Sequence, residues 1–325
     1  MHLRSAWYFG FLAVGLAAPA CAATVTDHTL ARPEGPRHYL VAEAEGMPKA
    51  KRPVLILLHG HGASAAMMVG LASFGGYTTQ EWPALAAREN IPLLAPDGVK
   101  ASDGKSVWND CRGDATTNAT TDDVGLVAAL IDTAIGQFDA DPGRVCVFGA
   151  SNGGGMASRV GIELASRVAA IGVQSGLMPV QSECPAPSRP LSVLIAHGTA
   201  DQISPYAGGK VGNWFLHGRG SGHGAEQSVA IWRNLAGLPE TAAAHRFPHL
   251  RPSDQTSATR YVWGANPALT QGEFLRIDGG GHVGAAKEGE LPWLWRTLLG
   301  DRNHDVDTAE EALSFFKTKR NTGVH

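Results

Sequence analysis

The chain of 325 residues is poor in charged residues, in aromatic residues and in cysteine. Charged residues make up 18% and aromatic residues 7% of it, and the formal net charge is −3. Residues 49–52 form the one basic cluster, so the sequence lacks the electrostatic footprint of a nucleic-acid-binding protein and predicts no nucleic-acid partner. A hydrophobic fraction of 44% excludes a disordered chain and is typical of a well-buried globular protein.

Long hydrophobic runs are also missing. No stretch approaches the roughly 20 apolar residues that a membrane-spanning helix needs. The N-terminus has the features of an export signal instead: Arg4, an apolar run over residues 7–18, and small residues up to Ala23. Cleavage after Ala20 and cleavage after Ala22 fit equally well. We therefore predict a signal peptide over residues 1–22 and a secreted or periplasmic mature protein.

Cysteine occurs only four times and never as Cys-x-x-Cys, so nothing supports a zinc or redox motif. Cys21 lies in the signal segment, and a lipid anchor there is the less favoured alternative because Ala18 and Pro19 fit a lipoprotein signal poorly. Cys146 falls in an apolar run and is predicted to be a buried thiol. Cys111 and Cys184 fall in polar loops, and export to an oxidising compartment leads to the hypothesis that they form a disulfide.

Glycine is abundant, and the most informative glycines flank Ser151. The apolar run 145–148 predicts a buried strand, Gly149-Ala-Ser-Asn-Gly153 follows at once, and residues 156–165 have helical spacing. A strand, G-x-S-x-G and a helix in this order are typical of a nucleophile elbow, where side chains at the two glycines would obstruct the turn. The alternative is a serine that merely caps the helix.

Short apolar runs alternate with helical patterns along most of the chain. The expected strands are residues 38–44 (an edge strand), 53–58, 91–95, 145–148, 169–175, 191–196, 260–263 and 273–277. The expected helices are residues 79–89, 121–135, 156–165, 226–235, 292–299 and 308–317. This alternation predicts an α/β fold with a mostly parallel sheet and helices on both faces. Residues 24–36 are expected to be an extended lead-in, residues 99–120 an irregular pocket wall, and residues 23–325 one catalytic domain.

A nucleophilic serine needs a histidine base and an acid that orients the histidine. In a strand–helix fold of this kind the expected chain order is serine, acid, histidine, with the functional groups just beyond the carboxyl ends of strands. Asp201 and His282 each lie five residues beyond a predicted strand, and His282 follows three glycines. Asp278 and Asp97 are rival acids, but Asp278 is very close to His282 in sequence and Asp97 precedes the serine.

Two backbone N–H groups are the predicted donors to a developing oxyanion. The first belongs to Asn152 at the start of the helix. The second is assigned to His61 in the loop His59-Gly-His-Gly62, with Gly62 as the next choice. The side chains of His59 and His61 are expected to be structural or pocket-lining. The remaining loop histidines have irregular spacing, so no metal site is predicted at His217, His223, His245 and His249.

Four motifs together resemble the LpqC-like branch of the polyhydroxybutyrate depolymerase and feruloyl esterase family. They are residues 121–132, 144–156, 197–201 with Pro205-Tyr206, and 279–282. The resemblance covers most of residues 35–318 and implies an α/β-hydrolase fold, carboxylic ester hydrolysis, and Ser151, Asp201 and His282 in the triad positions. Three departures lie near the pocket: Val283-Gly284 where Trp-Pro is frequent, the His-Gly-His-Gly loop, and a long insertion after Tyr206.

The sequence therefore predicts an exported serine esterase that needs no cofactor and acts on small or polymeric esters. Trp108, Trp214 and Tyr206 are the predicted substrate-binding residues, and Phe215 lies beside Trp214. Core or surface packing is an equal alternative for the aromatic side chains at 108, 214 and 215. A serine peptidase of the same fold and a non-catalytic polymer-binding lipoprotein are the alternative functions. Hydroxycinnamoyl, acetyl-sugar and polyhydroxyalkanoate esters all remain open as substrates.

Overall fold

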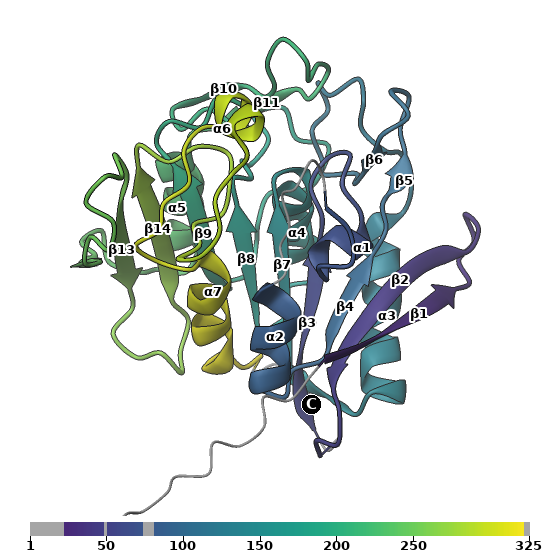
Figure 1. Cartoon of the computed structure of the whole chain (residues 1–325). Helices are drawn as coiled ribbons and strands as arrows, with labels where there is room; N and C mark the ends of the chain where they lie inside the picture. The colour runs from purple at the N-terminus through teal and green to yellow at the C-terminus, as the bar shows by residue number, and fades with distance from the viewer. Residues whose placement is uncertain (1–22, 49–50, 74–80, 322–325) are drawn as a thin grey trace, which may run out of the picture.

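A computed structural model describes residues 23–48, 51–73 and 81–321, so the predicted signal peptide lies outside the described residues. A ten-stranded sheet crosses the molecule in the order β1-β2-β4-β3-β7-β8-β9-β14-β13-β12 (Figure 1). Its strands are β1 (Ala23–Leu30), β2 (Arg37–Ala44), β3 (Arg52–Leu58), β4 (Leu93–Pro96), β7 (Ala140–Ala150), β8 (Ala170–Gln174), β9 (Ser192–Gly198), β12 (Ala243–Arg246), β13 (Ser257–Trp263) and β14 (Gly272–Asp278). The six strands from β4 to β14 run parallel to one another, whereas β1, β2, β13 and β12 each run antiparallel to their neighbours.

Helices cover both faces of the sheet, as predicted. On one face α3 (Asp123–Gln137), α4 (Asn152–Glu163) and α5 (Ala225–Leu235) contribute to one buried apolar layer, which also contains Ile56 and Leu58 of β3. On the other face α2 (Glu81–Arg88) and α7 (Thr308–Lys317) contribute to a second buried apolar layer, which contains Leu55 and Leu57 of the same strand. Since neighbouring residues of a strand point to opposite faces, only a continuously apolar strand can serve both layers, which explains the unbroken apolar runs of the sequence.

Short elements gather at the carboxyl ends of the parallel strands (Figure 1). They are α1 (Ala65–Met68), the ribbon of β5 (Val99–Lys100) and β6 (Ser106–Val107), the ribbon of β10 (Gly208–Lys210) and β11 (Ser221–His223), and α6 (Trp293–Leu299). Both ribbons are antiparallel pairs apart from the main sheet. None of the helices in the described ranges is long and apolar enough to span a bilayer.

The edges of the sheet differ from the sequence-based prediction. Residues 38–44 were expected to be an edge strand, but β1 pairs along the whole length of β2 and forms the edge itself. The side chains of β1 alternate between half-buried and exposed, so its mixed polar sequence indicated only an extended lead-in and no paired strand. At the opposite edge, β12 was not predicted because all four of its residues are exposed and carry no apolar pattern.

Candidate active site

Ser151 occupies a sharp turn between β7 and α4. Its backbone has φ 56° and ψ −118°, a left-handed conformation that is costly for a residue other than glycine. A Cβ atom at Gly149 would overlap the backbone of Gly153, and one at Gly153 would overlap the backbone oxygen of Leu58. The expectation that only glycine fits at both positions is confirmed. The turn thus holds the serine at the carboxyl edge of β7 in a strained backbone that the surrounding strands enforce.

His282 and Asp201 lie next to Ser151, although they are distant from it in sequence. The Nε2 atom of His282 is 2.8 Å from Ser151 Oγ, and Nδ1 is 2.8 Å from Asp201 Oδ2. The other carboxylate oxygen of Asp201 accepts the N–H groups of Ile203 at 2.9 Å and Ser204 at 2.8 Å. Burial opposes charge on Asp201, but His282 and the backbone N–H of Ser204 keep the pKa of its carboxyl below the usual value. The three groups form one hydrogen-bonded chain.

Glycines place the His282 loop close to two other segments. The His282 N–H donates to Leu299 O at the end of α6 at 2.5 Å. A Cβ atom at Gly281 would overlap that same carbonyl, and one at Gly198 would overlap the backbone of Gly280. The glycine run before the histidine therefore lets β14 deliver His282 between the end of β9 and the end of α6.

The rival acids have other partners. Asp278 Oδ1 pairs with the Arg276 guanidinium at 2.7 Å on the surface. Asp97 lies 2.6 Å from His38 Nδ1 and also accepts the Ala65 N–H at 2.7 Å. Neither acid is hydrogen-bonded to His282, so among the described residues the carboxylate that contacts its ring is that of Asp201.

Both predicted oxyanion donors border Ser151. Asn152 is the first residue of α4, so its N–H has no acceptor within the helix. The loop after β3 passes over the serine, because a Cβ atom at Gly60 would lie 3.3 Å from Ser151 Cβ. The Gly62 N–H donates to Ser106 O at 2.8 Å, whereas no acceptor is found for the His61 N–H in the described ranges. Gly62, the second choice in this loop, is therefore already engaged.

The imidazoles of His59 and His61 support this loop. His59 Nε2 accepts the Gly98 N–H at 2.9 Å, which leaves Nδ1 to donate to Gly60 O at 2.7 Å. Burial lowers the pKa of His59 to about 4, so the ring is neutral. His61 Nε2 lies 2.7 Å from Asp103 Oδ2. Both rings face partners within the protein, consistent with the structural role expected for them.

Comparison with known proteins identifies the family. Residues 41–218 match the phospholipase/carboxylesterase family. The chain belongs to this family. It is 25% identical over 304 residues, 91% of the chain and 84% of the relative, to a protein of Nocardia uniformis subsp. tsuyamanensis named "Putative esterase NocK". It is 28% identical over 253 residues, 77% of each chain, to a protein of Aspergillus terreus named "Probable feruloyl esterase C".

The chain also has weaker similarity to solved structures. An acetyl xylan esterase from Aspergillus awamori superposes with a TM-score of 0.47 at 12% identity, over 77% of this chain and 92% of that one. The family match and the mostly parallel sheet confirm the predicted α/β-hydrolase fold and carboxylic ester hydrolysis, and the protein is a carboxylesterase.

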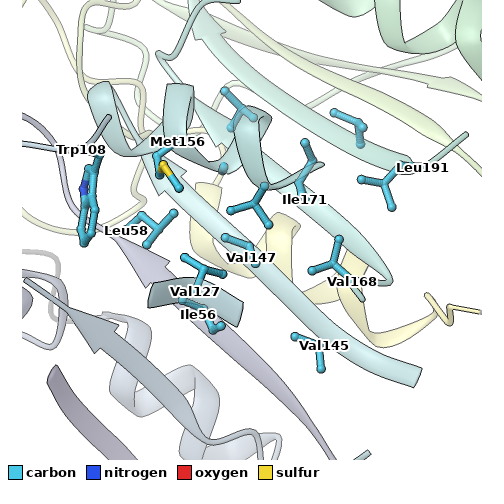
Figure 2. Packing of buried hydrophobic residues seen from close by; sticks show 14 of the residues in the cluster. Ile56, Leu58, Trp108, Val127, Val145, Val147, Met156, Val168, Ile171 and Leu191 are labelled. Carbon is cyan, nitrogen blue, oxygen red and sulfur yellow. The ribbon is translucent and has the colours of Figure 1, made fainter. Parts of the chain in front are cut away.

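The three aromatic residues that were predicted to bind substrate differ in their burial. Trp108 is fully buried and donates from Nε1 to His59 O at 2.8 Å, so the assignment of its ring to the pocket wall is wrong. Figure 2 shows it in the core, beside Leu58 and Met156. Tyr206 is half-buried and donates its hydroxyl to Glu226. Trp214 is 77% exposed, in the insertion between β10 and β11.

A buried ionic cluster that the sequence did not indicate lies beside Asn152, one of the predicted oxyanion donors. Asp110 accepts from Arg112 and Asn118, and Arg219 approaches it to 3.8 Å. These residues carry no periodic pattern. The available signal was that Asp110 and Arg112 flank Cys111, for which a disulfide was already expected.

The disulfide hypothesis agrees with the structure, in which Cys111 and Cys184 are joined. They form, with Glu163, a group of potential metal ligands in the described residues, but the disulfide occupies both sulfurs.

A polar cavity of about 270 Å³ lies away from the serine. Its lining contains no triad residue and consists of Arg251, Ser253, Asp254, Gln255, Thr256, Glu290, Leu291, Arg296, Asp301, Arg302 and His304.

Proposed function

We propose that this carboxylesterase cleaves its substrate through an acyl-enzyme on Ser151, with His282 as base and Asp201 as the orienting acid. The observation that carries the proposal is the unbroken chain from Asp201 Oδ2 through both nitrogens of His282 to Ser151 Oγ, at 2.8 Å for each contact. Such a chain fits a serine that attacks a carbonyl and a histidine that shuttles the proton.

The reaction follows from these positions. His282 Nε2 takes the Ser151 proton as Oγ bonds to the ester carbonyl carbon, and Asp201 stabilises the imidazolium that results. The N–H groups of Asn152 and His61 donate to the oxyanion, and one such donor contributes roughly 10²–10³-fold to the rate. His282 then protonates the leaving alcohol. The same nitrogen then takes a proton from water as the water oxygen attacks the acyl carbonyl carbon, and it returns this proton to Ser151 Oγ as the acid leaves.

The substrate class proposed is a feruloyl, polysaccharide-linked or polyhydroxyalkanoate ester. Two features support it: a relative is named as a feruloyl esterase, and Trp214 and Phe215 expose a T-shaped aromatic pair in the insertion. A hydrolysis screen over methyl ferulate, acetylated xylan and polyhydroxybutyrate distinguishes these esters. Trp214→Ala should raise KM for the preferred aromatic or polymeric ester and leave p-nitrophenyl acetate hydrolysis unchanged.

Export is also part of the proposal, with residues 1–22 removed and residues 23–325 forming one catalytic domain that uses no cofactor. The Cys111–Cys184 disulfide supports it, since structural disulfides persist in oxidising compartments. N-terminal sequencing of exported protein tests it and distinguishes cleavage after Ala20 from cleavage after Ala22.

A fluorophosphonate probe and the Ser151→Ala variant test the proposed chemistry. The probe should label the wild type at Ser151, and the variant should lose labelling and p-nitrophenyl butyrate hydrolysis while it keeps its circular dichroism spectrum. Ser158 is a buried serine on α4, the helix that follows Ser151. The Ser158→Ala variant is the matched control and should be labelled normally. An unlabelled wild type would favour the non-catalytic lipoprotein, and peptide cleavage exceeding ester cleavage would favour the peptidase.

A further inference from the structure

The side chain of Asn152 faces away from the reacting serine and is wholly engaged. Asn152 is 2% exposed, its Oδ1 accepts the Trp108 N–H at 2.8 Å, and its Nδ2 donates to Trp108 O at 3.2 Å. Nδ2 also donates to Asp110 Oδ2 at 2.7 Å. Three hydrogen bonds therefore tie the first residue of α4, whose N–H is a proposed oxyanion donor, to the segment 108–110.

Asp110 is the charged centre of this connection. Its Oδ2 also accepts from Arg112 Nε at 3.0 Å, and its Oδ1 accepts from Asn118 Nδ2 at 2.8 Å. Burial opposes ionisation, but the charges of Arg112 and Arg219 keep the pKa of the Asp110 carboxyl below its usual value. A Cβ atom at Gly155 would lie 2.9 Å from Oδ2, so the carboxylate rests against the first turn of α4. The helix dipole favours an anion at that end.

The same segment also braces the second proposed donor. Trp108 Nε1 donates to His59 O, Ser106 O accepts the Gly62 N–H, and Asp103 contacts the His61 imidazole. Residues 103–110 thus contact the loop after β3 and the start of α4 together. Two donors that bind one oxygen must keep their separation, and a displacement of about 1 Å can cost roughly 10²-fold in rate.

We infer that Asp110 is a positioning residue of the oxyanion hole, which acts through the Asn152 side chain to set the Asn152 N–H against the His61 N–H. The inference rests on the proposed function. A carboxylate is required because both of its oxygens accept. An amide at this position would turn its NH₂ either toward Asn152 and Arg112 or toward Asn118, which are all donors to Asp110.

The test uses Asp110→Asn, Asn152→Ala and the double variant, with p-nitrophenyl butyrate as substrate and phenylboronic acid as inhibitor. The boronate adduct on the serine places a tetrahedral oxygen in the oxyanion hole. Each single variant should lower kcat about 10- to 100-fold, leave KM little changed and weaken the boronate by a similar factor. The double variant should be no worse than the poorer single variant, because both changes break the same connection. Asp114→Asn, whose partner is Ser221 on β11, is the control and should keep wild-type kcat and boronate affinity.

Several results would overturn the inference. They are unchanged kcat and boronate affinity in Asp110→Asn, a change confined to KM, or single effects that multiply in the double variant. If loss of the buried charge unfolds the Asp110→Asn protein, the Asn152→Ala variant decides alone. Asn152→Ala leaves the arginines paired with Asp110, so wild-type kcat in Asn152→Ala refutes the inference. Fluorophosphonate labelling is read first. An unlabelled Ser151 refutes the proposed function as well, whereas a labelled serine with unaffected variants refutes only the role of Asp110.

Discussion

Replacing Asp201 by asparagine tests the catalytic proposal most directly. One oxygen of Asp201 accepts two backbone N–H groups, from Ile203 and Ser204, and the other faces His282 Nδ1. In Asp201→Asn the amide oxygen must stay with the two backbone donors, because an NH₂ group there would meet only other donors. The NH₂ group therefore points at Nδ1, which can then only accept. The ring proton moves to Nε2, and His282 donates to Ser151 instead of accepting from it.

The expected loss follows from this inverted tautomer. In a serine triad such a change costs about 10⁴-fold in kcat, which is about 5 kcal/mol of activation free energy. Stability should change little, because the two backbone hydrogen bonds survive. The assay is kcat/KM for p-nitrophenyl butyrate, with thermal unfolding to show that the variant is folded.

Asp278→Asn is the matched control. Its side chain is partly exposed and pairs with Arg276, and surface ion pairs contribute only about 0–1 kcal/mol. Activity should therefore remain close to that of the wild type. The assignment of the acid is refuted if Asp278→Asn is the crippling change while Asp201→Asn stays nearly as active as the wild type.

Three further predictions concern stability. The pKa of His59 is about 4 in the fold, against about 6.5 for a free histidine, so between these values only the unfolded chain binds the proton and stability falls as pH falls. Urea unfolding should show about 2 kcal/mol less stability from this group at about pH 5 than at about pH 7.5, and His59→Gln should remove that difference. Gly153→Ala should cost about 1–3 kcal/mol or more in thermal unfolding, whereas Gly136→Ala, with open space around it, should stabilise the protein by about 0.5–1 kcal/mol. Non-reducing peptide mapping should recover Cys111 linked to Cys184, and reduction of this bond across 73 residues should lower stability by about 2–4 kcal/mol; two free thiols would refute it.

Features that depend on residues close together in the chain could be predicted before the fold was known. The elbow at Ser151 follows from Gly149 and Gly153, since the clash that excludes other residues involves the turn itself and the adjacent strand. The strands on both sides of it were predictable because a strand buried on both faces must be apolar throughout. The cap of α7 is equally local: Asp307 accepts the N–H groups of Ala309 and Glu310, two and three residues further along the chain.

Contacts between residues far apart in the chain depend on the order of the strands in the sheet and could not be predicted. Asp201 and His282 are 81 residues apart, and the ends of β9 and β14 bring them together while Asp278 turns toward Arg276. Composition could not show that the Trp108 ring lies in the core, because a tryptophan in an irregular loop fits a pocket wall equally well. The role of Asp110 could not be predicted from the sequence either. A buried carboxylate is stable only when donors surround it, and those donors come from segments far apart in the chain.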